Sequence, residues 1–158
     1  MNKFMKIAKE NADNGILKGE GGPFGAVIVD ENGKIIANGN NKVILLKDPT
    51  AHAEIIAIRE ACKKLNTYDL SNCTLYTSCE PCPMCLSAII WANIKDIYYG
   101  CTRADAEHIG FRDNIIYDYL EGKNNNVINI TKIDREECIK TFEEYKNKNG
   151  LIYWHEVI

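Results

Sequence analysis

Long hydrophobic runs are missing from this sequence. No apolar stretch approaches the ~20 residues that a membrane-spanning helix requires. The N-terminal stretch, MNKFMKIAKE, lacks the apolar core of a targeting segment and has the pattern of an amphipathic helix. An odd number of cysteines, 7, without such a segment favours reduced thiols over a disulfide framework. We therefore expect a cytoplasmic protein with no membrane partner.

An excess of positive charge is also absent. The chain has 19 Lys and Arg against 22 Asp and Glu, which gives a formal net charge of −3. Because phosphate contacts need clustered basic side chains, this balance argues against nucleic acid as the main partner. Repeats and low-complexity linkers are missing too, and 158 residues with 46% hydrophobic composition can form one core without cross-links. We expect a single domain over residues 1–158.

Hydrophobic periodicity predicts helices and strands that alternate along the chain. The expected helices are 3–18, 51–65, 82–93, 111–120 and 134–148, and the expected strands are 26–30, 34–38, 73–77, 97–101 and 127–130. This order predicts an α/β fold with three layers, α/β/α, and a mixed five-stranded sheet. The apolar tail 151–158 is interpreted as an edge strand, a dimer arm or a lid.

Cys82 and Cys85 form a candidate metal-binding pair. They are three residues apart, so both sulfurs face one spot if this segment is helical. Pro81 and Pro83 bracket Cys82, and proline is tolerated in a helix only at the first turn. A helix start carries partial positive charge, which favours the thiolate form that binds metal. Two thiolates do not fill a zinc site, so we expect further ligands elsewhere in the chain.

His52 is the candidate third ligand. With Cys82 and Cys85 it gives three protein ligands, the number that leaves a fourth position open for water in a catalytic zinc site. Zinc lowers the pKa of such a water to about 7, and Glu54 is the candidate acid and base that moves its protons. Thr50 is expected to cap the helix that starts here, so that His52 and Glu54 can project past the helix end into one cavity.

A closed structural zinc site is the alternative. Cys79 would be its fourth ligand, and it would displace the water and remove the enzymatic function. We favour a buried, unligated Cys79, because free cysteine is commonly a core residue. The corresponding functional alternative is a zinc-stabilised interaction module without activity.

The pattern His52-Ala53-Glu54 followed by Pro81-Cys82-Pro83-Met84-Cys85 resembles the zinc signature of the cytidine deaminase-like superfamily. This resemblance implies the three-layer fold of that superfamily. It implies one zinc ion per subunit, held by His52, Cys82 and Cys85. It also implies that Glu54 carries a proton from water to the departing ammonia.

Within that superfamily the chain looks most similar to bacterial guanine deaminases. The stretches that carry this likeness are 21–29, 48–54, 76–86 and 110–117. The first three are largely shared with tRNA adenosine deaminases, whereas Gly110–Tyr117, GFRDNIIY, differs from the small-residue stretch of the tRNA enzymes. The resemblance implies hydrolysis of free guanine to xanthine and ammonia. The alternatives are adenosine-to-inosine conversion in tRNA, and deamination of cytosine or another aminated heterocycle.

The resemblance also implies the residues that contact a small purine base. It places Asn41 on the purine ring, the Ala53 backbone N–H on a ring or exocyclic acceptor, and Phe24 in the pocket wall. Asp113 is implied to recognise the guanine-side substituent or to move protons, so it is a candidate catalytic and binding residue. From the residues alone, Asn41 can instead cap a turn and Asp113 can cap a helix.

Guanine deaminases of this type are homodimers in which the C-terminal segment closes the site of the partner. The corresponding segment here is the tail 151–158, with Tyr153, Trp154 and His155. We therefore expect a homodimer.

Overall fold

The structure, a computed structural model, describes residues 1–153. It forms two compact units, Met1–Asn114 and Ile115–Ile158. The elements of the first unit are α1 (Lys3–Leu17), β1 (Gly25–Asp30), β2 (Ile35–Asn40), α2 (Val43–Leu46), α3 (Ala53–Leu65), β3 (Cys73–Cys79), α4 (Pro83–Trp91), β4 (Asp96–Cys101) and α5 (Arg103–His108). Helix α6 (Asn114–Leu120) starts at the boundary, and α7 (Arg135–Asn147) lies in the second unit.

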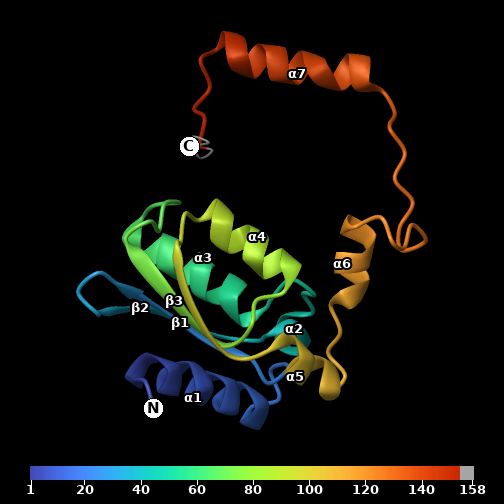
Figure 1. Ribbon diagram of the computed structural model, residues 1–158. Coiled ribbons are helices and arrows are strands. Elements are labelled where there is room, and N and C mark those ends of the chain that lie inside the picture. The colour runs from blue at the N-terminus through green and yellow to red at the C-terminus, as the bar shows by residue number, and fades with distance from the viewer. Residues whose placement is uncertain (154–158) are drawn as a thin grey trace. The chain divides into compact units, whose positions relative to one another are not determined.

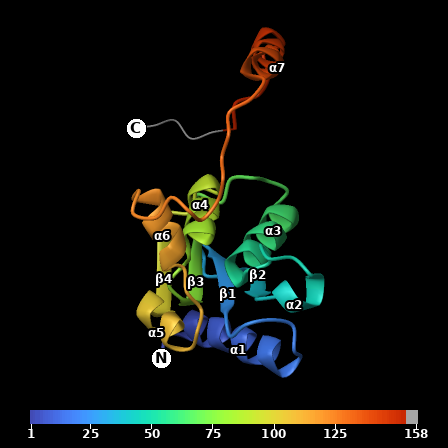
Figure 2. The same cartoon turned by 90° about the vertical axis from the view of Figure 1, so that its right-hand side faces the viewer.

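The first unit is built around a mixed 4-stranded sheet with the strand order β2-β1-β3-β4. β1 pairs antiparallel with β2 and β3, and β3 pairs parallel with β4. Helix α1 covers one face of the sheet, and α3 and α4 cover the other (Figure 1, Figure 2). The expected α/β fold with three layers and a mixed sheet is confirmed.

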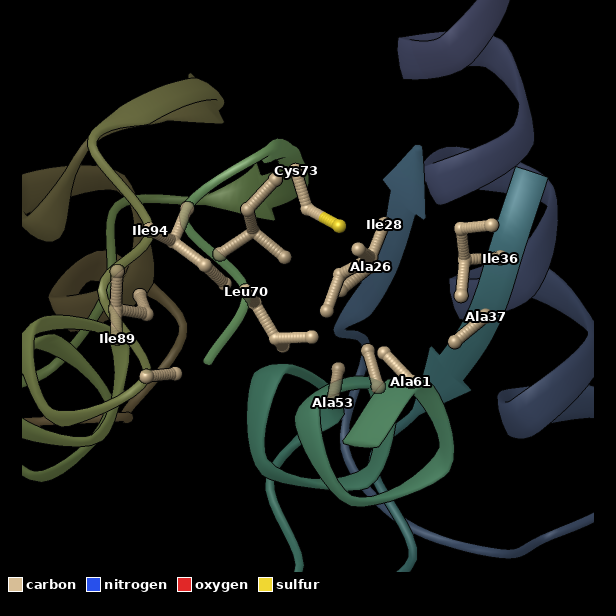
Figure 3. Packing of buried hydrophobic residues seen from close by; sticks show 13 residues of the cluster. Ala26, Ile28, Ile36, Ala37, Ala53, Ala61, Leu70, Cys73, Ile89 and Ile94 are labelled. Atoms are coloured by element: carbon tan, nitrogen blue, oxygen red, sulfur yellow. The ribbon is translucent and has the colours of Figure 1, made fainter. Parts of the chain in front are cut away.

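The main core lies between the sheet and the layer formed by α3 and α4. Ile28, Leu70 and Ile89 are buried there among alanines (Figure 3). Full burial of one such aliphatic side chain stabilises the fold by about 1.5–3 kcal/mol. Because alanines leave little bulk between the layers, α3 lies close to the strands that it covers.

Two glycines allow the closest approaches of helices to the sheet. A Cβ atom at Gly39 of β2 would lie 2.2 Å from the Ala53 carbonyl oxygen of α3. A Cβ atom at Gly25 of β1 would lie 2.0 Å from the Ala8 carbonyl oxygen of α1. No side chain fits at either position, so each helix backbone packs directly on a strand. The start of α3 is thereby fixed against the end of β2.

The prediction of a fifth strand is not confirmed. Residues 127–130 form no strand, and Ile128 and Ile130 are 51% and 73% exposed. A strand needs a neighbour that pairs with its backbone N–H and C=O groups, and no described strand pairs with this segment. Residues 151–153 have no regular structure, and the rest of the tail lies outside the described residues.

The starts of two helices also differ from the predictions, and a helix between β4 and α6 was not predicted. His52 is the N-cap residue of α3, whereas Thr50 lies before the helix and its hydroxyl donates to Asp48 Oδ1 at 2.7 Å. Helix α6 begins at Asn114, later than the expected residue 111. Helix α5 was not expected, and it begins with a capping box between Thr102 and Asp105.

The second unit contains no buried side chain among its described residues, 115–153. Helix α7 agrees with the helix predicted over 134–148, and the Tyr145 hydroxyl donates to the Leu151 carbonyl at 2.6 Å. Phe142 on this helix is 73% exposed. None of the helices in residues 1–153 is long and apolar enough to cross a membrane.

Candidate active site

The starts of α3 and α4 bring three metal-binding side chains together. His52 is the N-cap residue of α3, Cys82 is the N-cap residue of α4, and Cys85 lies in the first turn of α4. His52 Nδ1 lies 3.6 Å from Cys82 Sγ and 3.5 Å from Cys85 Sγ. A tetrahedral zinc ion with its usual bond lengths requires N–S separations of about 3.6 Å. The donor set and its spacing therefore fit zinc.

The two thiols of this centre differ in their affinity for a proton. Hydrogen bonds from the Cys85 thiol, from His52 and from the Cys85 backbone N–H lower the pKa of the Cys82 thiol to about 4, against the opposing effect of burial. The hydrogen bond to Cys82 and burial raise the pKa of the Cys85 thiol. Cys82 is therefore ready to bind a cation, and metal binding displaces the proton of Cys85.

Cys79 stays outside the metal-binding group. Its thiol lies 3.7 Å from the Thr102 carbonyl oxygen, and burial raises its pKa to about 11. Within residues 1–153 the metal-binding group consists of His52, Cys82 and Cys85, whose donor atoms all lie within 4.8 Å of one another. This geometry agrees with the open three-ligand arrangement and not with the closed four-ligand alternative.

Glu54 is buried beside this centre, in the first turn of α3. Its Oε2 accepts a hydrogen bond from Cys85 Sγ at 3.4 Å, and its Oε1 lies 3.1 Å from Thr77 Oγ1. Burial raises the pKa of the Glu54 carboxyl. His52 has extended backbone angles, φ −70° and ψ 158°, and so precedes the helical twist. This is why two residues two positions apart reach the same site.

A cavity of about 580 Å³ opens beside the metal centre, within the size range of small-molecule sites. Its lining includes Phe24, Asn41, His52, Glu54, Glu80, Cys82, Arg103, Phe111 and Asp113. The rings of Phe24 and Phe111 meet edge to face with centroids 5.0 Å apart. Of the predicted site residues, Cys85 and Ala53 are fully buried and do not line the cavity.

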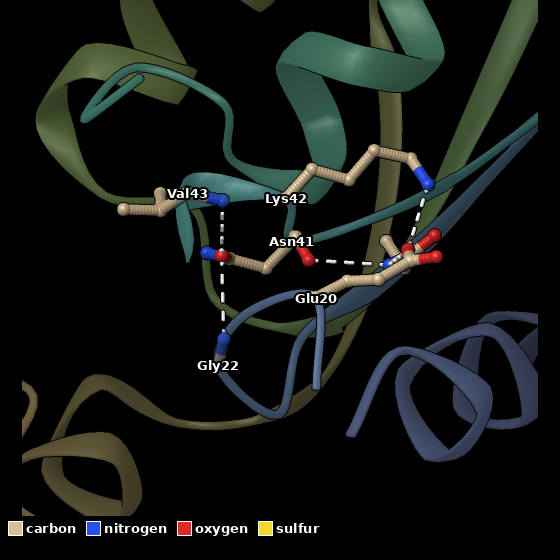
Figure 4. Close-up of polar contacts among 6 residues, drawn as sticks. Glu20, Gly22, Asn41, Lys42 and Val43 are labelled. Carbon is tan, nitrogen blue, oxygen red and sulfur yellow. Dashed lines mark hydrogen bonds and ion pairs between the residues drawn. The ribbon is translucent and has the colours of Figure 1, made fainter. Parts of the chain in front are cut away.

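Asn41 lines the cavity directly after the end of β2. Its Oδ1 accepts hydrogen bonds from the backbone N–H groups of Gly22, at 3.3 Å, and Val43, at 3.1 Å (Figure 4). Two donors on one side-chain atom identify that atom as the oxygen of the amide. The Asn41 side-chain oxygen therefore caps the turn, as one interpretation of the sequence predicted. Its N–H₂ group remains available to other partners.

Asp113 lies in the same cavity as the metal centre. Its Oδ1 is 3.9 Å from Arg103 Nε, and burial raises the pKa of its carboxyl while Arg103 opposes that rise. The Arg103 backbone N–H donates to Glu80 Oε2 at 2.9 Å. Sequence reasoning missed Arg103 and Glu80 as cavity residues. The signal that could have found Arg103 is the capping box at Thr102, which starts α5 at this point.

A family model matches this part of the chain. Residues 1–101 match the model described as the cytidine and deoxycytidylate deaminase zinc-binding region. The chain belongs to this family. The match covers His52, Glu54, Cys82 and Cys85, so the expected zinc centre and the expected hydrolytic deaminase activity are confirmed at the level of the family.

Individual relatives are similar over nearly the whole chain. A guanine deaminase from Bacillus subtilis is 47% identical over 145 residues, which are 91% of this chain and 92% of that protein. The X-ray structure of guanine deaminase from Bacillus subtilis is 44% identical, covers 100% of both chains and gives a TM-score of 0.87. A tRNA-specific adenosine deaminase from Haemophilus influenzae is 40% identical over 147 residues, with 92% of this chain and 83% of that protein covered.

Proposed function

We propose that this protein hydrolyses free guanine to xanthine and ammonia, consuming one water molecule per turnover. The observation that carries the reaction type is the buried Glu54 carboxyl beside a three-donor metal centre in an open cavity. The observation that favours guanine is the similarity, over about nine-tenths of both chains, to a guanine deaminase from Bacillus subtilis.

Glu54 carries the proton transfers in this proposal. When bound by His52, Cys82 and Cys85, zinc supplies a water molecule of lowered pKa. The Glu54 carboxylate accepts the two protons of this water one after the other, and it delivers the first to the ring nitrogen and the second to the departing amine. Burial raises the pKa of this carboxyl, which makes its carboxylate a stronger proton acceptor. Thr77 holds one carboxyl oxygen, which orients the group.

The opposite wall of the cavity recognises the base. The Asn41 N–H₂ group donates to an acceptor on the purine. The predicted contact of the Ala53 backbone N–H with a ring or exocyclic acceptor is not part of this proposal, because Ala53 is fully buried and does not line the cavity. The Asp113 carboxylate accepts from the amino group of guanine, which is the group that leaves the reacting carbon, or moves a proton there. Phe24 packs against the ring, and its contact with Phe111 stiffens that wall.

The working form of the protein is proposed to be a cytoplasmic homodimer, with residues 1–158 as one functional domain and the tail 151–158 closing the site of the partner. Exposed apolar side chains support this proposal, because Leu151, Ile152 and Tyr153 are 63%, 74% and 67% exposed. The other two tail residues named for this role, Trp154 and His155, lie outside the described residues.

An ammonia-release screen tests the proposed function. The zinc-loaded protein is incubated with guanine, adenine, cytosine and their nucleosides, and Glu54→Gln serves as the control. The proposal expects more ammonia from guanine than from the other compounds, and about 10²–10⁴-fold slower release from the control. Ammonia from another base but not from guanine would overturn the substrate assignment, and full activity of Glu54→Gln would overturn the mechanism.

Adenosine deamination in tRNA is the second candidate, because a tRNA-specific adenosine deaminase is 40% identical over nearly the whole chain. This candidate requires a basic surface that holds RNA, and its binding must weaken steeply with salt. Inosine formation in tRNA, together with salt-dependent tRNA binding, would support it. The formal net charge of −3 favours guanine instead.

A further inference from the structure

Glu20 connects the end of β2 to the start of α2 without lining the cavity. Its Oε2 accepts hydrogen bonds from Lys42 Nζ and from Asn40 Nδ2, both at 2.7 Å (Figure 4). These two bonds lower the pKa of the Glu20 carboxyl. The Glu20 backbone carbonyl accepts from the N–H groups of Ile44 and Leu45 at 3.1 and 3.0 Å. One residue therefore restrains both sides of the turn between β2 and α2.

Asn41 lies in that turn, between the two side chains that bind Glu20. Asn40 Nδ2 also donates to the Asn41 carbonyl at 3.1 Å, and the Asn41 N–H donates to the Phe24 carbonyl at 3.0 Å. With Oδ1 bound by Gly22 and Val43, every polar group of Asn41 except Nδ2 has a partner among the described residues. The N–H₂ group is thus the one hydrogen-bonding group that Asn41 offers to the cavity.

The loop that carries Glu20 also packs tightly on Asn41. A Cβ atom at Gly21 would lie 2.1 Å from Asn41 Oδ1 and 2.5 Å from the Asn41 carbonyl oxygen. Because the Gly21 backbone lies directly against Asn41, a shift of this loop by a few tenths of an ångström changes the position of the Asn41 amide. The Glu20 side chain anchors this loop to the turn, because its carboxylate binds Lys42. The Glu20 side chain is only 15% exposed.

We propose that Glu20 is a positioning residue for base recognition, which binds Lys42 and Asn40 and thereby holds the Asn41 amide group as a donor to the base. The inference rests on the proposed deamination of guanine at this cavity. It goes beyond that function, because Glu20 touches neither the base nor the metal centre. Charge-assisted hydrogen bonds at a largely buried carboxylate hold geometry more firmly than exposed ion pairs do.

A double-mutant cycle tests this role. Glu20→Gln keeps the size of the side chain and removes its charge, and Lys42→Met removes the partner. Each is measured alone and combined with Asn41→Ala, with kcat, KM for guanine and the thermal midpoint as readouts. We expect each single variant to raise KM about 3–10-fold while kcat changes less, because one hydrogen bond to the base is misaligned. In the Asn41→Ala background we expect no further rise in KM.

Lys9→Met is the matched control. Lys9 and Asp13 form an ion pair of the same length, 2.7 Å, on the exposed face of α1. We expect this variant to keep the wild-type KM. An unchanged KM in both Glu20→Gln and Lys42→Met, or a KM rise that persists in full in the Asn41→Ala background, would overturn the positioning role. The second outcome would assign Glu20 to general stability instead.

The cycle is repeated by calorimetry with 8-azaguanine, a ligand that has been crystallised with structurally similar chains, so that the result does not depend on turnover. This arm separates the two proposals. If wild-type protein neither converts guanine nor binds 8-azaguanine, the proposed function is overturned. If wild type does both and the Glu20 and Lys42 variants bind 8-azaguanine as wild type does, only the positioning role is overturned.

Discussion

The two halves of the cavity are held in place by different parts of the fold. The metal-facing half comes from the first turns of α3 and α4, which pack on the sheet as part of the core. The base-facing half comes from connections between elements, such as Gly21–Phe24, Asn41 and the residues after α5. The difference implies that the chemistry depends on the core, whereas the choice of base depends on loops that can vary around it.

The largest expected effect follows from removal of one metal ligand. Cys85→Ser replaces a buried thiolate donor, so we expect loss of bound zinc and a fall of ammonia release to the level of a blank without enzyme. Atomic absorption and an ammonia assay measure both quantities. Cys138→Ser, at an exposed cysteine outside the cavity, serves as the control and should keep zinc and activity. Activity of zinc-free Cys85→Ser would contradict a metal-dependent reaction.

The second largest effect also concerns the metal-facing half of the cavity, and it distinguishes proton transfer from metal binding. Glu54→Gln removes the ionisable group, so we expect kcat to fall by about 10²–10⁴-fold while zinc content is retained. Glu60→Gln, at an exposed position of the same helix, is the control and should change neither quantity. Zinc loss in Glu54→Gln would show that Glu54 supports the metal and not the proton transfers.

A smaller effect is expected in the base-facing half. Asp113→Asn removes a charged acceptor, so we expect KM for guanine to rise about 10–100-fold, the range for a hydrogen bond to a charged group. Inhibition by adenine should change much less, because adenine lacks the amino group that guanine has on its reacting carbon. Steady-state kinetics with both bases measures the contrast. Equal weakening of guanine and adenine would argue that Asp113 shapes the wall without reading the base.

The smallest expected effect concerns the stability of the turn behind Asn41. Hydrogen bonds from Lys42 and Asn40 lower the pKa of Glu20 in the folded protein. A lowered folded pKa stabilises the protein above the ordinary carboxyl pKa, and this contribution is lost as pH falls through the folded value. We expect the melting temperature of wild type to exceed that of Glu20→Gln at pH 7, and the difference to shrink as pH falls below the ordinary carboxyl pKa. A difference that is constant across this range would exclude the ionised carboxylate as its cause.

The sequence alone was sufficient for the metal-facing half. The spacing of Cys82 and Cys85 and the prolines around Cys82 depend on local geometry, which sequence patterns report well. His52 lies 30 residues from Cys82, and it was assigned through the number of ligands that a catalytic zinc site needs and through the resemblance to the family signature. The exact helix start was wrong because Thr50 binds Asp48 instead of capping α3. That competition between two local hydrogen bonds leaves no signature in the periodicity of apolar residues.

The base-facing half was predicted only in part, because its contacts join distant parts of the chain. The orientation of the Asn41 amide depends on Gly22, which lies on another loop. Glu20 binds partners 20 and 22 residues away, and nothing in its neighbourhood in the sequence indicates them. The fifth strand failed for a related reason: the apolar pattern of residues 127–130 allows a strand, but pairing requires a neighbour that no local pattern provides.

The most direct test of the account is the rate of xanthine formation from guanine by the zinc-loaded wild-type protein, with Glu54→Gln measured beside it. The account predicts xanthine and ammonia in equal amounts from wild type, and a rate about 10²–10⁴-fold lower from the variant. Absence of xanthine from the zinc-loaded wild type would contradict the proposed function. Equal rates from the two proteins would contradict the role of Glu54.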